Sequence, residues 1–133
     1  LTVLQCGGSS GDPHRGFLFQ SGEGADAVLE GVTVSGGFAP GLPESRGGGV
    51  ICTAGSSPTF RTCVFTFNTA KFGGGVYCDS ASPRLVNCTL SRNTVGLGAG
   101  SKGGGLYCSS NASKPQVTSS VVWGNEASSP KSR

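Results

Sequence analysis

The feature that most constrains this chain is a repeat built from two blocks of constant length, separated by gaps whose length varies. The first block reads GGGVIC at 47–52, GGGVYC at 73–78 and GGGLYC at 103–108. The second block reads PTFRTCVFTFN at 58–68, PRLVNCTLSRN at 83–93 and PQVTSSVVWGN at 115–125. Constant blocks with elastic gaps indicate that the blocks stack on one another and that the gaps form loops.

A degenerate earlier copy precedes these three, with GFLF at 16–19 and LEGVTVSGG at 29–37. The opening LTVLQC has strand spacing, so we expect the sequence to start inside a structural unit. We therefore expect one β domain over residues 1–125, followed by a polar, flexible tail at 126–133. Its coils would span residues 1–15 (a partial coil), 16–46, 47–72, 73–102 and 103–125.

Alignment of the copies predicts columns of small or medium apolar side chains that alternate along short strands and face one interior. The columns are Phe17, Val50, Val76 and Leu106; Phe19, Cys52, Cys78 and Cys108; Leu29, Phe60, Leu85 and Val117; Val32, Cys63, Cys88 and Ser120; and Val34, Phe65, Leu90 and Val122. One copy cannot bury such a face alone, so the copies must stack. This predicts an all-β, single-stranded parallel β-helix of about four coils with three short strands each, right-handed because parallel crossovers are.

Glycine and asparagine recur where the chain would have to turn. The column of Gly31, Thr62, Asn87 and Ser119 falls where the inward parity changes, which predicts a corner with left-handed backbone, although Thr62 fits it poorly. Asn68, Asn93 and Asn125, with Gly37 in the early copy, would end each strand at a bend. The triple glycines would begin the next coil, where backbones approach closely or turn sharply.

Two sequence patterns carry a family resemblance. GGGV at 73–76 beside Phe65-Thr-Phe-Asn68 resembles the repeats of the chlamydial polymorphic membrane proteins. The stretch SGEGADAVLEGVTVSGG at 21–37, followed by GGGVYC and SPRLVNC, is similar to the right-handed β-helix passenger domains of secreted or surface proteins. The resemblance covers residues 16–125. It implies an extracellular or cell-surface location and a role in adhesion, assembly or glycan contact.

Composition excludes several other classes of protein. The 24 glycines argue against a helical protein, because each interior glycine costs a helix about 1 kcal/mol relative to alanine. No apolar run approaches the ~20 residues that a membrane span needs. The net charge of +3 is mild and the Lys and Arg residues are scattered, so we expect no nucleic-acid partner.

The six cysteines have two interpretations. Most of them, namely Cys52, Cys63, Cys78, Cys88 and Cys108, fall in inward columns, where a free thiol serves as a small apolar side chain. In a secreted protein they could instead form disulfides, either within coils (52 with 63, 78 with 88) or between coils (63 with 78, 88 with 108). Zinc is not expected, because no CxxC or histidine pair occurs and His14 is the only histidine.

The acidic residues do not indicate catalysis. Enzymes on this fold use clustered carboxylates on an outer face, yet none of the seven acids here recurs in a column. Calcium binding at Glu23, Asp26 and Glu30 is the alternative to a solvated acidic turn. We expect no catalytic residue, no metal and no cofactor; a polysaccharide lyase or glycoside hydrolase is the alternative.

Candidate surface sites are few. Arg46, Lys71 and Lys102 precede the glycine runs at similar positions, and Tyr77 and Tyr107 share an outward column with Leu18 and Ile51. Together these basic and aromatic residues would suit an anionic glycan or a protein partner; the alternatives are solvated loop charges and tyrosines packed beneath a loop. Two sequons begin at Asn87 and Asn111, and Asn111 in a variable loop is the better acceptor for a glycan.

The ends of the predicted solenoid expose strand edges and apolar columns, and no capping helix is apparent. We therefore expect the partners to be flanking coils or other copies of the chain, stacked end to end. The leading functional hypothesis is a non-catalytic extracellular module for structure or adhesion. The alternative is a glycan-binding or polysaccharide-processing domain.

Overall fold

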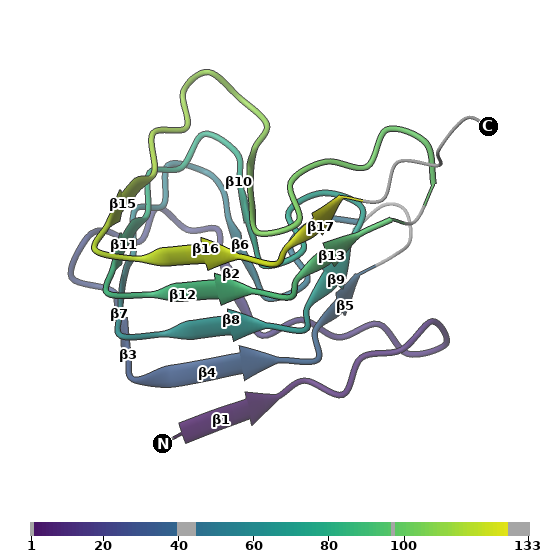
Figure 1. Ribbon diagram of the computed structural model, residues 1–133. Coiled ribbons are helices and arrows are strands. Elements are labelled where there is room, and N and C mark those ends of the chain that lie inside the picture. The colour runs from purple at the N-terminus through teal and green to yellow at the C-terminus, as the bar shows by residue number, and fades with distance from the viewer. Residues whose placement is uncertain (1, 40–44, 97, 128–133) are drawn as a thin grey trace.

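The protein is a solenoid of parallel β-strands, seen here in a computed structural model that describes residues 2–39, 45–96 and 98–127. Strands that recur once per coil stack into four parallel sheets, which we call sheets I to IV in chain order (Figure 1). Each coil passes through sheets I, II, III and IV before the next coil begins. The all-β solenoid of about four coils confirms the fold class expected from the repeat.

The strands are short because each covers one side of a narrow coil. Sheet I contains β2 (Phe17–Phe19), β6 (Val50–Cys52), β10 (Val76–Cys78) and β14 (Leu106–Cys108). Sheet II contains β3 (Val28–Glu30), β7 (Thr59–Arg61), β11 (Arg84–Val86) and β15 (Gln116–Thr118). Sheet III contains β1 (Thr2–Gln5), β4 (Val32–Ser35), β8 (Val64–Thr66), β12 (Thr89–Ser91) and β16 (Val121–Trp123). Sheet IV contains β5 (Phe38–Ala39), β9 (Thr69–Ala70), β13 (Thr94–Val95) and β17 (Glu126–Ala127).

The register of the sheets is the one that the sequence alignment predicts. Val50 pairs with Val76 and Val76 with Leu106 in sheet I, while Phe60 pairs with Leu85 in sheet II. In sheet III the opening strand β1 pairs with β4, which confirms the strand spacing expected in LTVLQC over Thr2–Gln5. The variable gaps do not shift the register, because the extra residues form loops outside the stacked strands.

The core is the stack of inward columns. It is a single cluster of buried residues, whose members are Val34, Val50, Cys52, Phe60, Cys63, Phe65, Val76, Cys78, Ala81, Leu85, Cys88 and Leu90. Phe19, Phe60 and Phe65 form a chain of edge-to-face ring contacts through the middle of it. At about 1.5 to 3 kcal/mol for each fully buried side chain, these columns are the main stabilising element.

The corners use left-handed backbone, as expected. Gly31, Thr62, Asn87 and Ser119 have φ of 65°, 51°, 53° and 49°, so Thr62 adopts the corner conformation that it fits poorly. A second such column, Gly36, Phe67, Arg92 and Gly124, turns the chain from sheet III into sheet IV. The triple glycines satisfy a spatial requirement: a Cβ on Gly75 would lie 2.6 Å from the carbonyl oxygen of Gly105 in the next coil.

Sheet IV was not expected. The sequence indicated three strands per coil, but the short stretches after the asparagines form a fourth, with Ala39, Ala70 and Val95 buried inside it. Two residues are too few to show alternation, which is why the pattern missed them. The β-helix also extends past the predicted boundary at residue 125, since Glu126–Ala127 form its last strand; the tail from residue 128 lies outside the described residues. In the described part of the chain, no helix is long and apolar enough to cross a membrane.

Candidate functional site

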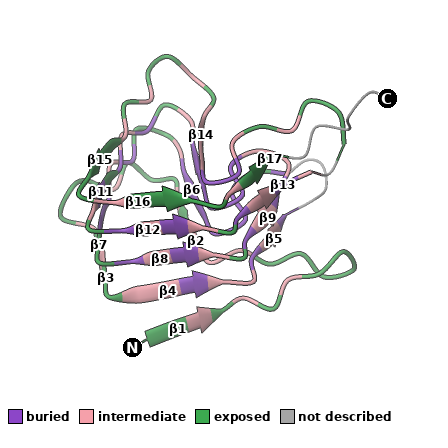
Figure 2. Ribbon diagram, viewed as in Figure 1, coloured by how far each residue is buried: buried purple, intermediate pink, exposed green. Residues whose placement is uncertain are grey.

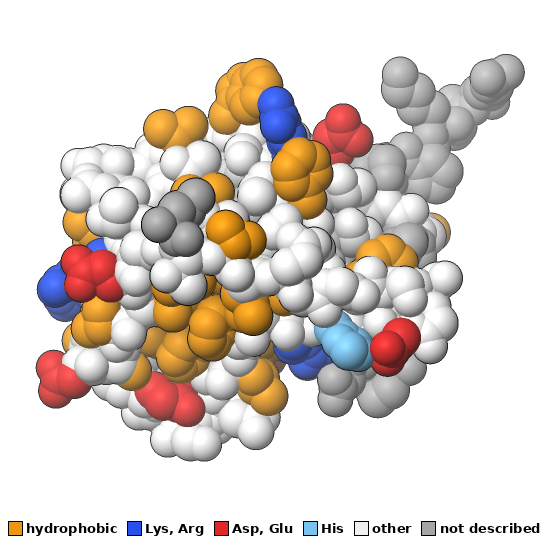
Figure 3. Space-filling view, turned by 90° about the horizontal axis from the view of Figure 1, so that it is seen from below, with side chains coloured by type: hydrophobic (Ala, Val, Ile, Leu, Met, Phe, Trp, Pro, Cys, Tyr) orange, Lys and Arg blue, Asp and Glu red, His pale blue; other side chains and the backbone are white. Residues whose placement is uncertain are grey.

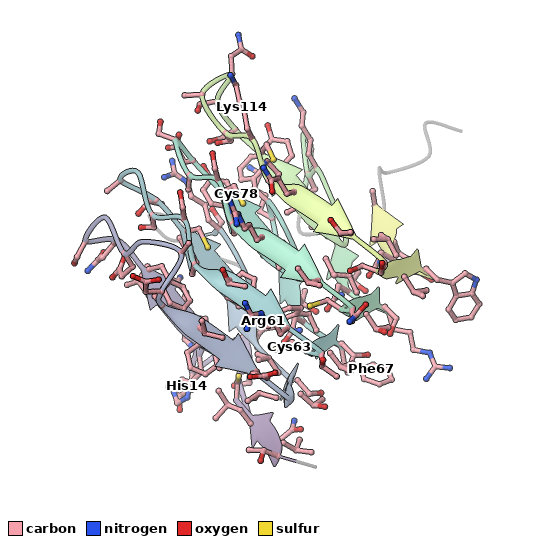
Figure 4. The ribbon with its side chains drawn as sticks, turned by 90° about the vertical axis from the view of Figure 1, so that its left-hand side faces the viewer. His14, Arg61, Cys63, Phe67, Cys78 and Lys114 are labelled. Atoms are coloured by element: carbon pink, nitrogen blue, oxygen red, sulfur yellow. The ribbon has the colours of Figure 1, made fainter. Side chains whose placement is uncertain are left out.

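Five of the six cysteines form two columns inside the solenoid. Cys52, Cys78 and Cys108 are register partners in sheet I, and Cys63 lies beneath Cys88 at the start of sheet III. All six cysteines of the chain are free thiols. Cys78 ends β10 in sheet I, whereas Cys63 directly precedes β8 in sheet III (Figure 4). Neither disulfide scheme considered from the sequence joins neighbours within a column. The cysteines thus act as core side chains.

Burial and contact between stacked thiols shift the pKa values of these cysteines in both directions. Hydrogen bonding to Cys52 and burial raise the pKa of Cys78 far above its usual range. Burial also raises the pKa of Cys108, to about 11. At the other column, the hydrogen bond between the two thiols lowers the pKa of Cys63 and raises that of Cys88. At neutral pH the thiols of Cys78, Cys88 and Cys108 are therefore protonated, whereas Cys63, with a pKa of about 7, is partly ionised.

A ladder of asparagines joins the coils where sheet III turns into sheet IV. Asn68 and Asn93 are fully buried. The side-chain amide of Asn68 donates to Asn93 Oδ1 at 3.0 Å and to the carbonyl oxygen of Val34 at 3.0 Å. Asn93 repeats the pattern, donating to Asn125 Oδ1 at 2.9 Å and to the carbonyl oxygen of Phe65 at 2.8 Å. The sequence predicted the bend at these residues but not the hydrogen bonds between coils.

The backbone takes part in the same ladder. The backbone N–H of Gly37 donates to Asn68 Oδ1, that of Asn68 to Asn93 Oδ1, and that of Asn93 to Asn125 Oδ1. The Oδ1 of each asparagine therefore accepts hydrogen bonds from the preceding coil. Its own backbone and side-chain N–H groups need an acceptor in the following coil. This gives the ladder a direction, and its last member, Asn125, lies at the C-terminal end of the stack.

Both ends of the solenoid are open. At the C-terminal end, the inward residues Val117 and Val122 are 44% and 56% exposed, whereas Leu85 and Leu90 one coil below are fully buried. Figure 2 shows this as exposed strands over a buried middle. At the N-terminal end, apolar side chains gather in the centre of the face (Figure 3). The apolar columns and strand edges thus continue to both surfaces.

The predicted ligand surface is only partly assembled. Tyr77 is 2% exposed, which contradicts the expectation that it contributes an open aromatic face. The reason is that Arg46, which directly precedes the triple glycine at 47–49, lies against the outward side of this ring. The Arg46 guanidinium lies 5.4 Å from the centre of the Tyr77 ring and covers it. Tyr107, one coil above, is only half-buried.

The basic residues that precede the triple glycines are not aligned between coils in the way that the sequence predicted. The residues that bridge between coils are Arg46, Phe72 and Lys102, so Phe72 occupies the position at which Lys71 was expected. Lys71 is nearby, with its ammonium 5.7 Å from the centre of the Phe72 ring. Phe72 stacks on Tyr107 at 5.7 Å. We call these residues, Arg46, Lys71, Phe72, Lys102 and Tyr107, the aromatic–cation cluster.

The two sequons lie on the surface. Asn87 is an exposed corner residue with φ of 53°, and its backbone N–H donates to the carbonyl oxygen of Thr118. Asn111 is exposed in the loop between β14 and β15, beside a turn closed by Ser113 and Ser110. Both side chains are sterically accessible, and glycosylation at either remains a prediction.

Comparison with known proteins places the fold. A family model described as the right handed beta helix region matches residues 10–129. The chain belongs to the right-handed β-helix family. No curated protein and no solved structure matches it. The match supports the right-handed coil expected from parallel crossovers and does not extend to the narrower polymorphic-membrane-protein relationship, which stays a prediction.

The acidic residues of this β-helix do not gather. Glu23 accepts hydrogen bonds from the Ser21 backbone N–H at 3.0 Å and from Ser56 Oγ at 2.9 Å. Hydrogen bonding from its own backbone, from the Ser21 backbone and from Ser56 holds the pKa of its carboxyl below the usual value. Asp12 pairs with His14 at 2.9 Å on the exposed surface. Over residues 2–39, 45–96 and 98–127, no group of three His, Cys, Asp or Glu side chains could hold a metal ion. Glu23 thus ties its loop to the next coil.

Proposed function

We propose that the chain is a non-catalytic structural module of an extracellular or surface-exposed β-helix, and that it acts by receiving further coils at its ends. The single observation that carries the proposal is the continuation of the apolar columns and the asparagine ladder to an exposed C-terminal face. Asn125 presents there the same backbone and side-chain donors that Asn93 directs into the next coil. A following coil with an acceptor at that position would complete them.

The chemistry of this face favours another coil over an unrelated partner. The edge strands of the four sheets at this end, β14, β15, β16 and β17, all belong to the same coil. An incoming coil would extend every sheet at about 4.8 Å spacing and bury Val117 and Val122. Because both are about half exposed already, this would stabilise the stack by about 1 kcal/mol for each valine.

The test is to lengthen the solenoid at this face. Residues 96–102 followed by 73–95, placed after Ala127, would supply a connecting loop and one complete coil. We expect a higher urea midpoint and a steeper unfolding slope than for the parent chain, because more surface becomes buried. The matched control carries the same extension with Leu85, Leu90 and Val95 of the added copy changed to serine. Equal stability of the two extended chains would contradict the proposal.

A second candidate function is contact with an anionic glycan through the aromatic–cation cluster. The observation that favours it is that cations lie next to aromatic rings on one side of the solenoid. Arg46 lies over the Tyr77 ring and Lys71 over the Phe72 ring. Lys102 bridges to Phe72, whose ring stacks on Tyr107. Aromatic faces suit the apolar faces of sugars, and the cations suit carboxylate or sulfate groups.

This candidate is tested by titrating the chain with a uronic-acid oligosaccharide at low salt. We expect binding that weakens as salt rises, and weaker binding for Lys102→Ala and Phe72→Ala. Arg84→Ala, which removes an exposed cation from sheet II, is the matched control. Equal losses for Lys102→Ala and Arg84→Ala would reduce the interaction to general charge attraction.

A further inference from the structure

The N-terminal end of the solenoid is stepped, not flat. Sheet III has five strands, ending in β1, whereas sheets I and II have four and end in β2 and β3. β1 therefore lies one layer beyond β2 and β3. At sheet IV the end is closed differently: the backbone N–H of Phe38 in β5 donates to the carbonyl oxygen of His14 at 2.6 Å, in an antiparallel bridge. The open part of this end is thus the layer beneath β2 and β3.

The inward side chains of β2 and β3 are left partly uncovered where this layer is missing. Phe17, Phe19 and Leu29 occupy inward columns, and they are only partly buried, although their column neighbours Val50, Cys52 and Phe60 are fully buried. Apolar side chains also gather on the face seen from the end that carries β1 (Figure 3). Two neighbouring strands would cover it and would complete a coil together with β1.

A second copy of the chain does not fit this end. Its C-terminal coil carries a strand in every sheet, at one level. If that coil docked directly beneath β2 and β3, its β16 would occupy the place that β1 already fills. If it docked beneath β1, an empty layer one strand thick would remain under Phe17, Phe19 and Leu29. The two ends of the molecule differ by two strands and are not complementary.

We infer that the N-terminal end takes a two-strand segment of the same repeat, laid first along β2 and then along β3. This rests on the proposed function, because it assumes that the ends receive coils, and it names what one end accepts. The segment needs glycines before its first strand and apolar residues at two inward positions of that strand, as in Val76 and Cys78. Its second strand needs one inward apolar residue, as in Leu85, and after that strand a corner residue that tolerates left-handed backbone.

The chain itself supplies a probe with this chemistry. Residues 73–87 contain the triple glycine, both strands and the corner residue Asn87. Thr2 pairs with Val32, which shares a column with Cys88, so residues 73–87 placed directly before Thr2 would enter in register. We expect this grafted chain to show a higher urea midpoint, a steeper slope and at least tenfold slower hydrogen exchange at the β2 and β3 amides that face the added layer.

A matched graft carries serine in place of Val76, Cys78 and Leu85 of the added copy. Equal midpoints and equal exchange rates for the two grafted chains would overturn the inference. The C-terminal extension described above separates this failure from failure of the proposed function: stabilisation at the C-terminal end alone rejects only the two-strand segment, whereas no stabilisation at either end rejects both.

Association of the chain gives a second, independent readout. Removal of residues 1–15 deletes β1 and the His14 bridge and leaves whole coils, whose ends are then complementary. Sedimentation velocity should show concentration-dependent, elongated particles for the truncated chain and none for the intact chain. Long particles formed by the intact chain would overturn the inference while supporting end-to-end assembly. If the truncated chain fails to fold, the grafted chains still decide the question.

Discussion

The middle coils and the last coil have nearly the same sequence pattern but not the same environment. Leu90 in β12 is fully buried, whereas Val122, its register partner in β16, is 56% exposed. Asn93 is fully buried, while Asn125 at the same position is half-buried. Burial in this fold is thus a property of the neighbouring coil more than of the residue. Stability should be concentrated in the middle coils and decline toward the ends.

The sharpest test of this contrast is removal of one column side chain. Leu90→Ala should lower the free energy of unfolding by about 2 to 5 kcal/mol, because it leaves a cavity between two coils. Val122→Ala should lower it by less than about 1 kcal/mol, since its site is open to water. Urea denaturation of both variants measures the difference. Equal costs would show that the last coil is as well packed as the middle.

The glycine runs offer a test of close contact between coils. Gly75→Ala should cost about 1 to 3 kcal/mol, because the new Cβ would lie 2.6 Å from a backbone oxygen that cannot move alone. Gly24→Ala, in a loop where an added Cβ has open space, is the control and should be nearly neutral. Thermal unfolding of the two variants is sufficient. A neutral Gly75→Ala would mean that adjacent coils can separate at little cost.

The asparagine ladder should show the same gradient. Asn93→Ala removes the acceptor for the Asn68 amides and leaves the Phe65 carbonyl without its side-chain donor, at a cost of about 1 to 3 kcal/mol. Asn125→Ala should cost less, because water reaches the groups that it leaves unpaired. Hydrogen exchange at the backbone N–H of Asn68 and of Asn93 in the two variants locates each loss. A larger effect at Asn125 would reverse the expected gradient.

The smallest effect is expected at the corners. Thr62→Gly relieves a β-branched residue of left-handed backbone and should stabilise the chain by about 0.5 to 1 kcal/mol. Ser119→Gly, at the same corner in the last coil, should stabilise it less if that coil frays before the rest unfolds. Unfolding midpoints of the two variants decide this, and equal gains would place the last coil inside the cooperative unit.

The structural features that could be predicted from the sequence are those formed by the two blocks of constant length. The columns, the register and the left-handed corners follow from the blocks, including the corner at Thr62. The loops were less predictable, since their length varies and no column constrains them. The covering of Tyr77 by Arg46 and the replacement of Lys71 by Phe72 both arise in segments between blocks. The repeated asparagine does carry a signal for the ladder, because a buried asparagine at a bend needs hydrogen-bond partners in the neighbouring coils.

The ladder also bears on how the solenoid would respond to force. Asn68 contacts the carbonyl of Val34 in the coil below and Asn93 in the coil above, so a single side chain ties three successive coils together. Pulling along the axis would therefore load two inter-coil contacts at once wherever an asparagine has neighbours on both sides. The terminal coil lacks one of these ties. Rupture should begin there and then advance in steps larger than one coil.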